Sequence, residues 1–131
     1  MSRENVALTR RQIDAFNRRD WDAFVALADE RVEVESRLVA MEGSYRGHDG
    51  LRRWWDNFLG VLPDYSVEIE ELRDLGDATL THLRGYGHGD ASATPVIDPF
   101  WLPMRWQDGK AVWWRNCSTE AEALKAVGLE E

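Results

Sequence analysis

The sequence predicts a single α+β domain, residues 1–131, in which helical segments come mainly before an antiparallel sheet. In the first half of the chain apolar residues recur at helical spacing, whereas in the second half they alternate along the sequence. Two of the alternating segments are joined by Asp108-Gly109, a typical hairpin turn. The hydrophobic fraction of 44% and the seven tryptophans indicate a packed core, which the helices must form with one face of the sheet.

The helical segments are marked by apolar spacing and by capping residues. The first ends at 17–19 and carries Val6, Thr9, Ile13 and Phe16 at helical spacing. A second, shorter helix begins at Asp20, whose carboxylate can accept the free amides of its first turn. A third follows the turn-rich stretch 45–50 and is closed by Gly60; its apolar stripe is Leu51, Trp54, Trp55, Phe58 and Leu59.

The strand candidates lie on both sides of this third helix. Residues 31–38 alternate between apolar and charged or polar side chains, as in a half-buried strand. After a break at Pro63-Asp64, further strands are predicted over 65–72, 77–88, 97–107 and 111–118. A capping box formed by Thr119 and Glu122 then begins a last short helix.

The charge balance argues against nucleic acid as a partner. The chain has 24 acidic and 16 basic residues, a formal net charge of -8, which would repel a phosphate backbone. No segment has the apolar length of a signal peptide or of a membrane span, so we expect a cytoplasmic protein that does not enter membranes. Cys117 is the only cysteine and is expected to be a core or interface residue.

One strand candidate carries a row of large polar side chains. Taken as a strand, the stretch THLRGYGHG at 81–89 places on one face His82, Arg84, Tyr86 and His88. The alternation alone leaves open whether this face meets water or a pocket. His82 and His88 would lie about 20 Å apart along the strand, too far to share one ion. We therefore predict no metal site, and we expect no cofactor.

Three sequence motifs resemble the SnoaL-like members of the nuclear transport factor 2-like superfamily. The family's opening helical pair is matched by AFNRRDWDAFVALADERVEVE, the entry to its third helix by YRGHDGLRRWW, and its closing hairpin and terminal helix by QDGK and TEAEALKAVGL. The resemblance implies a curved antiparallel sheet wrapped around the N-terminal helices, a cystatin-like α+β roll that forms a cone with a central pocket. It further implies a small-molecule ligand and a homodimer that pairs through the convex face of the sheet.

The family's strand register implies which side chains face the pocket. It turns His82, Arg84 and Tyr86 into the cone and leaves on the convex face Thr79, Thr81, Leu83, Gly85 and Gly87. The residues expected to line the pocket are Phe16, Phe24, Trp54, Trp55, Phe58, Tyr86, Phe100, Trp114 and Asn116. The alternative is that these aromatic rings merely fill the core.

The candidate catalytic residues are His82, Arg84 and Asp98. His82 and Arg84 would lie about 7 Å apart, where the arginine could hold an oxyanion and the histidine could move a proton near neutral pH. Asp98 precedes Pro99, where a strand begins at an edge or bulge, so its carboxylate could turn toward the pocket. The alternatives are a hydrogen-bonded core histidine, an internal ion pair of Arg84, for example with Asp98, and a solvent-exposed turn aspartate.

Two function classes fit these features. The first is a cofactor-independent acid/base enzyme, of isomerase, cyclase or hydratase type, that acts on a small apolar oxygenated molecule. The second is a non-catalytic ligand-binding or accessory dimer, since one fold serves many functions; an interaction module with a filled cone is a third. Within the family, ketosteroid isomerase uses a first-helix tyrosine and a base aspartate where this sequence has Gln12 and Ser36. We therefore expect no steroid isomerase activity.

Overall fold

The computed structural model describes residues 2–35, 44–88 and 95–129 of the chain. Its helices are α1 (Ser2–Asn17), α2 (Trp21–Ala26), α4 (Gly47–Val61) and α5 (Glu120–Ala126). Its strands are β1 (Ala28–Glu35), β2 (Tyr45–Arg46), β3 (Ser66–Asp74), β4 (Ala78–His88), β5 (Pro95–Gln107) and β6 (Lys110–Arg115). The predicted helices and strands are thus present, although the end of the predicted strand 31–38, which includes Ser36, lies outside the described residues.

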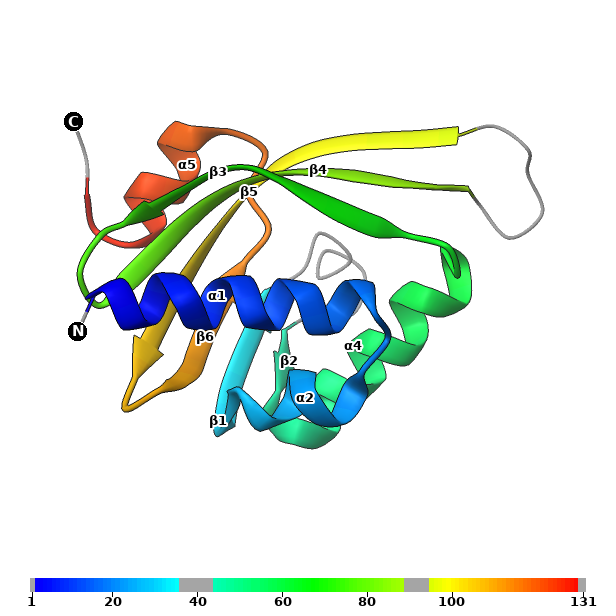
Figure 1. The fold of residues 1–131 in the computed structure, drawn as a ribbon, viewed down its shortest axis with the longest axis horizontal. Coiled ribbons are helices and arrows are strands. Elements are labelled where there is room, and N and C mark those ends of the chain that lie inside the picture. Colours follow the sequence, from blue (N-terminus) through cyan, green and yellow to red (C-terminus); the bar gives the residue numbers. More distant parts are fainter. Residues whose placement is uncertain (1, 36–43, 89–94, 130–131) are drawn as a thin grey trace.

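The described strands form one curved, six-stranded sheet in the order β2-β1-β6-β5-β4-β3. Neighbouring strands are antiparallel except for β1 and β6, which run parallel. The sheet is therefore mixed and not antiparallel throughout as predicted, because β1 and β6 are joined by a long connection through the rest of the fold. Figure 1 shows β3, β4 and β5 arching over α1, with α5 on the opposite side. The predicted α+β fold, a curved sheet around N-terminal helices, is confirmed.

Local sequence signals fix the ends of several elements. Asp20 caps α2, because its carboxylate accepts a hydrogen bond from the amide of Ala23 at 3.1 Å. The hydroxyl of Thr119 caps α5 in the same way. Asp108 and Gly109 have positive φ angles of 52° and 76°, as a two-residue hairpin loop requires. The predicted caps at Asp20 and Thr119 and the predicted turn are confirmed, although the Glu122 carboxylate of the predicted capping box accepts the amide of Ser118, one residue before its expected partner.

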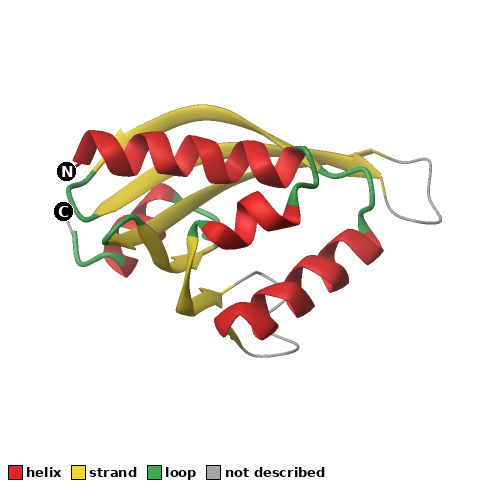
Figure 2. Ribbon diagram, turned by 60° about the horizontal axis from the view of Figure 1, so that its bottom comes forward, coloured by secondary structure: helices red, strands yellow, loops and turns green. Residues whose placement is uncertain are grey.

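The main core lies between the helices and the inner face of the sheet, and aromatic rings dominate it. Figure 2 shows α1, α2 and α4 on this side of the sheet. The ring of Phe16 is central, since its centroid lies 5.6 Å from that of Trp55 and 5.9 Å from that of Trp54. A smaller cluster, which includes Leu80 and Cys117, forms where α5 covers the outer face. Cys117 is fully buried, and burial raises the pKa of its thiol to about 11, as expected for a core residue.

The predicted register of β4 is wrong. The buried face of β4 is turned toward the helices. It carries Thr79, Thr81, Leu83, Gly85 and Gly87. Direct evidence for this direction is the 2.9 Å hydrogen bond between the hydroxyls of Thr79 and Thr9, a residue of α1. The large polar side chains therefore lie on the outer, convex face. The physical reason is that solvent hydrates the charge of Arg84 there, whereas the crowded inner side would have to pair and desolvate it.

Candidate small-molecule cavity

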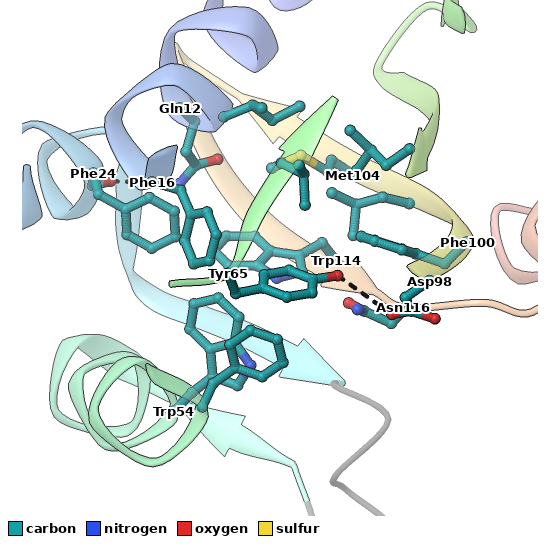
Figure 3. A pocket seen from close by; sticks show the side chains of 15 residues that line it. Gln12, Phe16, Phe24, Trp54, Tyr65, Asp98, Phe100, Met104, Trp114 and Asn116 are labelled. Carbon is teal, nitrogen blue, oxygen red and sulfur yellow. Dashed lines mark hydrogen bonds between the residues drawn. The ribbon is translucent and has the colours of Figure 1, made fainter. Parts of the chain in front are cut away.

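A cavity of about 350 Å³ lies between α1, α2, α4 and the inner face of the sheet. Several residues predicted to line a pocket do line it: Phe16, Phe24, Trp54, Phe58, Phe100, Trp114 and Asn116. The other lining residues are Gln12, Ile13, Tyr65, Val67, Leu83, Asp98, Leu102 and Met104. Apolar and aromatic side chains thus make most of the wall, and a few polar groups reach into it (Figure 3). This composition is typical of small-molecule sites.

Two residues predicted to line the pocket lie elsewhere. Trp55 is buried in the core, where its ring lies 4.9 Å from Phe24 and 5.3 Å from Trp21, and it does not line the cavity. It is on the side of α4 that packs against α2. Tyr86 lies on the outer face of β4, opposite Ile97 of β5, and is 37% exposed. Both predictions are wrong. Trp55 points from α4 in a different direction than expected, and Tyr86 lies on the opposite face of β4 because the register of this strand is reversed.

The predicted pair of His82 and Arg84 also lies outside the cavity. His82 stacks on Trp101, with ring centroids 4.1 Å apart and planes 2° from parallel. The guanidinium of Arg84 forms an ion pair with Glu70 at 3.1 Å, not with Asp98, and its side chain is 47% exposed. These contacts belong to the outer surface of the sheet. The prediction that the two residues act together in the pocket is therefore wrong.

Asp98 is the predicted catalytic residue that does reach the cavity. It lies on β5 directly opposite Gly85 of β4. Its carboxylate oxygen Oδ2 accepts a hydrogen bond from the Tyr65 hydroxyl at 3.3 Å, drawn as a dashed line in Figure 3. β5 begins at Pro95, two residues before the predicted start at 97. The expectation that the carboxylate turns toward the pocket agrees with its position in the wall.

Gly85 explains how Tyr65 reaches this carboxylate. A Cβ atom at Gly85 would lie 1.8 Å from the Tyr65 hydroxyl oxygen and 2.3 Å from its Cζ atom. Only a residue without a side chain therefore leaves room for the phenol to lie across β4 and meet Asp98 on the next strand. A Cβ atom at Gly87 would likewise lie 3.2 Å from the Cα and Cδ1 atoms of Tyr65, so this position is also crowded. The two glycines, which sequence reasoning assigned to a dimer surface, are the cradle of a buried tyrosine.

Tyr65 and Gln12 are the polar lining residues that sequence reasoning missed as site residues; the other unpredicted lining residues are aliphatic. Tyr65 was predicted only as the beginning of a strand, and the signal that could have found it is the alternation of glycines at 85 and 87, which marks a large side chain packed on that face. Gln12 is 2% exposed, and its Nε2 atom donates to the carbonyl oxygen of Phe24 at 3.4 Å. A polar residue on the apolar side of a predicted helix is the signal for Gln12.

Within 2–35, 44–88 and 95–129, no three His, Cys, Asp or Glu side chains gather in a way that could hold a metal ion. The absence of a cofactor stays a prediction. None of the helices in the same ranges has the length and apolar character of a membrane span.

The fold and the cavity together define a class of protein, the α+β domains in which a curved sheet and N-terminal helices enclose a pocket. The sequence profile of the SnoaL-like domain matches residues 9–114. The chain therefore belongs to the SnoaL-like family, which confirms the resemblance seen in the sequence. No curated protein sequence matches the chain significantly.

Solved structures with the same fold span almost the whole chain. An NTF2-like protein of unknown function from Burkholderia pseudomallei is 18% identical, with a TM-score of 0.81 and coverage of 98% of this chain and 99% of that one. A putative SnoaL-like polyketide cyclase from Jannaschia is 16% identical, with a TM-score of 0.80 and coverage of 100% and 96%. AclR, a putative hydroxylase from Streptomyces galilaeus, is 16% identical, with a TM-score of 0.75 and coverage of 98% of both chains. At these identities the likeness shows the fold alone.

Proposed function

We propose that this protein binds a small, mostly apolar molecule with oxygen functions in the cavity. The carrying observation is a volume of about 350 Å³ walled by aromatic and aliphatic side chains, with the polar groups of Gln12, Asp98 and Asn116 in the wall. Small-molecule sites combine these features, and their volumes begin at about 300 Å³. The polyketide cyclase named among the structural neighbours is consistent with such a ligand.

A thermal-shift screen tests the binding proposal. The panel contains steroids, polyketide-like aromatic compounds, terpenoids and small carboxylic acids, each measured on the wild type and on Leu102→Trp, which fills the cavity. A ligand at about 100 times its dissociation constant should add about 2.7 kcal/mol, a rise of several degrees. Leu129→Trp, at a 45% exposed position, is the matched control. Binding that Leu102→Trp abolishes and Leu129→Trp keeps supports the proposal; equal shifts in all three proteins contradict it.

A second candidate is acid/base catalysis without a cofactor, and a specific observation favours it. Asp98 is the one carboxylate in the described wall of the cavity, and the Tyr65 hydroxyl is bonded to it. A carboxylate so placed can take a proton from a carbon beside a ligand carbonyl and return it to another carbon, which is an isomerisation. The amide of Asn116 can donate a hydrogen bond to the oxygen on which charge develops. In this proposal His82 and Arg84 have no part.

Proton exchange separates catalysis from binding alone. Each compound that binds is incubated in D₂O, and loss of its carbon-bound protons is followed by NMR. Catalysis predicts exchange that Asp98→Asn slows by about 100-fold or more while binding persists. Asp108→Asn, in the hairpin turn, removes a carboxylate far from the cavity and should leave the rate unchanged. Binding without enzyme-dependent exchange would favour the accessory, non-catalytic reading.

We also propose that two copies pair through the outer face of the sheet. Tyr86 and Ile97 form a cross-strand pair there and are 37% and 62% exposed, which leaves apolar surface in contact with water. This proposal keeps the convex face of the predicted homodimer, but the residues on that face differ from those predicted. Light scattering during gel filtration should report a dimer that Ile97→Glu converts to a monomer. Val61→Glu, at a 60% exposed position on α4, should leave the mass unchanged.

A further inference from the structure

The wall of the cavity contains a buried amide oxygen with which no described residue forms a hydrogen bond. The Oε1 atom of Gln12 is buried and has no hydrogen-bond partner among the residues that the structure describes. The side chain as a whole is 2% exposed, so bulk water does not reach it freely. A buried acceptor of this kind carries the cost of lost hydration without a compensating bond. Such a group therefore indicates a partner that is absent from the protein itself.

The orientation of this amide is determined by its other end. The Nε2 atom of Gln12 donates to the backbone carbonyl of Phe24 at 3.4 Å. Turning the amide over would place two carbonyl oxygens against each other, so the oxygen must be the atom that points away from Phe24. Figure 3 shows the nitrogen turned toward Phe24 and the oxygen on the side of the cavity. The oxygen therefore lies on the cavity side of the amide, buried within the wall.

The charge of the wall restricts that occupant further. The described lining residues include the carboxylate of Asp98 and no Lys, Arg or His side chain. An anionic ligand would therefore lose its hydration without gaining a counter-ion. A neutral molecule with a hydroxyl or amine donor meets an acceptor at Gln12 and keeps its apolar rings against Phe16, Met104 and Trp114.

We propose that Gln12 determines the ligand specificity of the cavity by accepting a hydrogen bond from a donor on a neutral ring compound. The ligand class is thus phenols, ring alcohols or ring amines, in preference to their ethers and to carboxylic acids. This inference rests on the proposed binding function and names the chemistry that the cavity selects. Gln12 acts here as a binding residue, and no bond of the ligand is made or broken by it.

Matched probes test this specificity. The dissociation constants of 2-naphthol, 2-methoxynaphthalene and 2-naphthoate are measured by tryptophan fluorescence and calorimetry. The first two share a ring system and differ in the donor; the third is an anion at neutral pH. The wild type should bind 2-naphthol about tenfold more tightly than the ether, because the ether leaves Oε1 unpaired. It should bind 2-naphthoate more weakly than either.

The variant Gln12→Met separates ligand recognition from a structural role. Methionine keeps the length of the side chain without the amide, and the Phe24 carbonyl still accepts the amide of Leu27 at 3.3 Å. The preference for 2-naphthol over the ether should fall to about one, and the unliganded melting temperature should stay equal or rise, because an unpaired acceptor has been removed. Gln12→Leu should give the same loss of preference.

The outcomes distinguish this inference from the proposed function. If both neutral probes bind the wild type equally, or if Gln12→Met keeps the preference, the specificity role is wrong while the binding function stands. A lower melting temperature with an unchanged preference would make Gln12 a structural residue and would overturn the inference as well. If none of the probes binds and the ligand panel gives no shift, the proposed function fails and this inference fails with it.

Discussion

The two faces of strand β4 differ in how they are stabilised. On the inner face, Leu83 is 1% exposed and Gly85 lies under the ring of Tyr65, so stability there depends on shape. On the outer face, His82 stacks on Trp101 and Arg84 pairs with Glu70, both in partial contact with water. None of the large polar side chains of β4 therefore lines the cavity. The hydroxyl beside β4 in the cavity wall belongs to Tyr65, because Gly85 leaves room for its ring.

The largest effect is expected for Gly85→Ala, which tests whether the inner face depends on shape. A Cβ atom there would lie 1.8 Å from the Tyr65 hydroxyl oxygen, so the ring must move. We expect a loss of about 1–3 kcal/mol in the free energy of unfolding, as for other overpacked sites. Urea unfolding measures it, and the same variant should weaken ligand binding because Tyr65 leaves Asp98.

The control for this prediction is Gly60→Ala. Gly60 lies in α4, and a Cβ atom there would meet nothing within 4 Å. Because alanine is the better helix former, this variant should gain about 0.5–1 kcal/mol. A Gly85→Ala protein as stable as the wild type would mean that the inner face does not depend on shape as we describe.

The fold could be predicted from the sequence because its signals are local. The cap at Asp20, the hairpin at Asp108-Gly109 and the apolar stripe of α4 each depend on a few neighbouring residues. The direction in which β4 faces is not local, since a one-residue shift of register exchanges its two faces completely. Because Tyr65 packs on Gly85 and Gly87, the glycines face inward and the charged side chains of β4 face water. This contact joins segments that are distant in the sequence, so local patterns do not reveal it.

The candidate site was predicted in part for the same reason. Asp98 was found because the proline after it marks an edge of the sheet. Gln12 and Tyr65 were missed as site residues because their roles arise only when α1 packs against the sheet and Tyr65, just before β3, packs on the glycines of β4. Trp54 and Phe58, four residues apart in α4, share a helix face and line the cavity as predicted. Trp55, the next residue after Trp54, points to another side of the same helix, and its prediction was wrong.

Two threonines on the inner face of β4 test its polar contacts. The Thr9 hydroxyl donates to the Asn5 carbonyl at 2.8 Å, so in its 2.9 Å contact with Thr79 the donor is Thr79. The indole of Trp106 donates into the same pair, at 3.0 Å to Thr9. Thr79→Val should therefore lower the free energy of unfolding by about 1 kcal/mol. Calorimetric melting measures the change.

Thr81→Val is the matched comparison on the same strand and the same face. The Thr81 hydroxyl is buried and has no hydrogen-bond partner within the described residues. Removing an unpaired hydroxyl should be neutral or slightly stabilising, and valine suits a strand. Equal losses in the two variants would show that both positions respond to packing alone.

On the outer face, His82→Ala should have a smaller effect. It removes the stacked pair with Trp101, which is worth about 0.5–1.5 kcal/mol where rings are buried and less where water reaches them. Because His82 lies outside the cavity, ligand affinity and any proton-exchange rate should not change. A loss of activity at unchanged stability would restore the catalytic role that the sequence first indicated for this histidine.

The smallest effect is expected at the end of β4, where His88 meets Asp64. The pKa of Asp64 is lowered, first because the backbone amide of His88 donates to its carboxylate at 2.8 Å, and then because the His88 ring lies 2.9 Å away. A pKa lowered by folding stabilises the protein above the unfolded value, about 3.9 for aspartate, and this contribution is lost as the pH falls through the folded value. The difference in unfolding free energy between the wild type and Asp64→Asn should therefore be constant near neutral pH and shrink below about pH 4. A difference that stays constant to lower pH, or one that Asp108→Asn reproduces, would show that this contact does not set the acid stability.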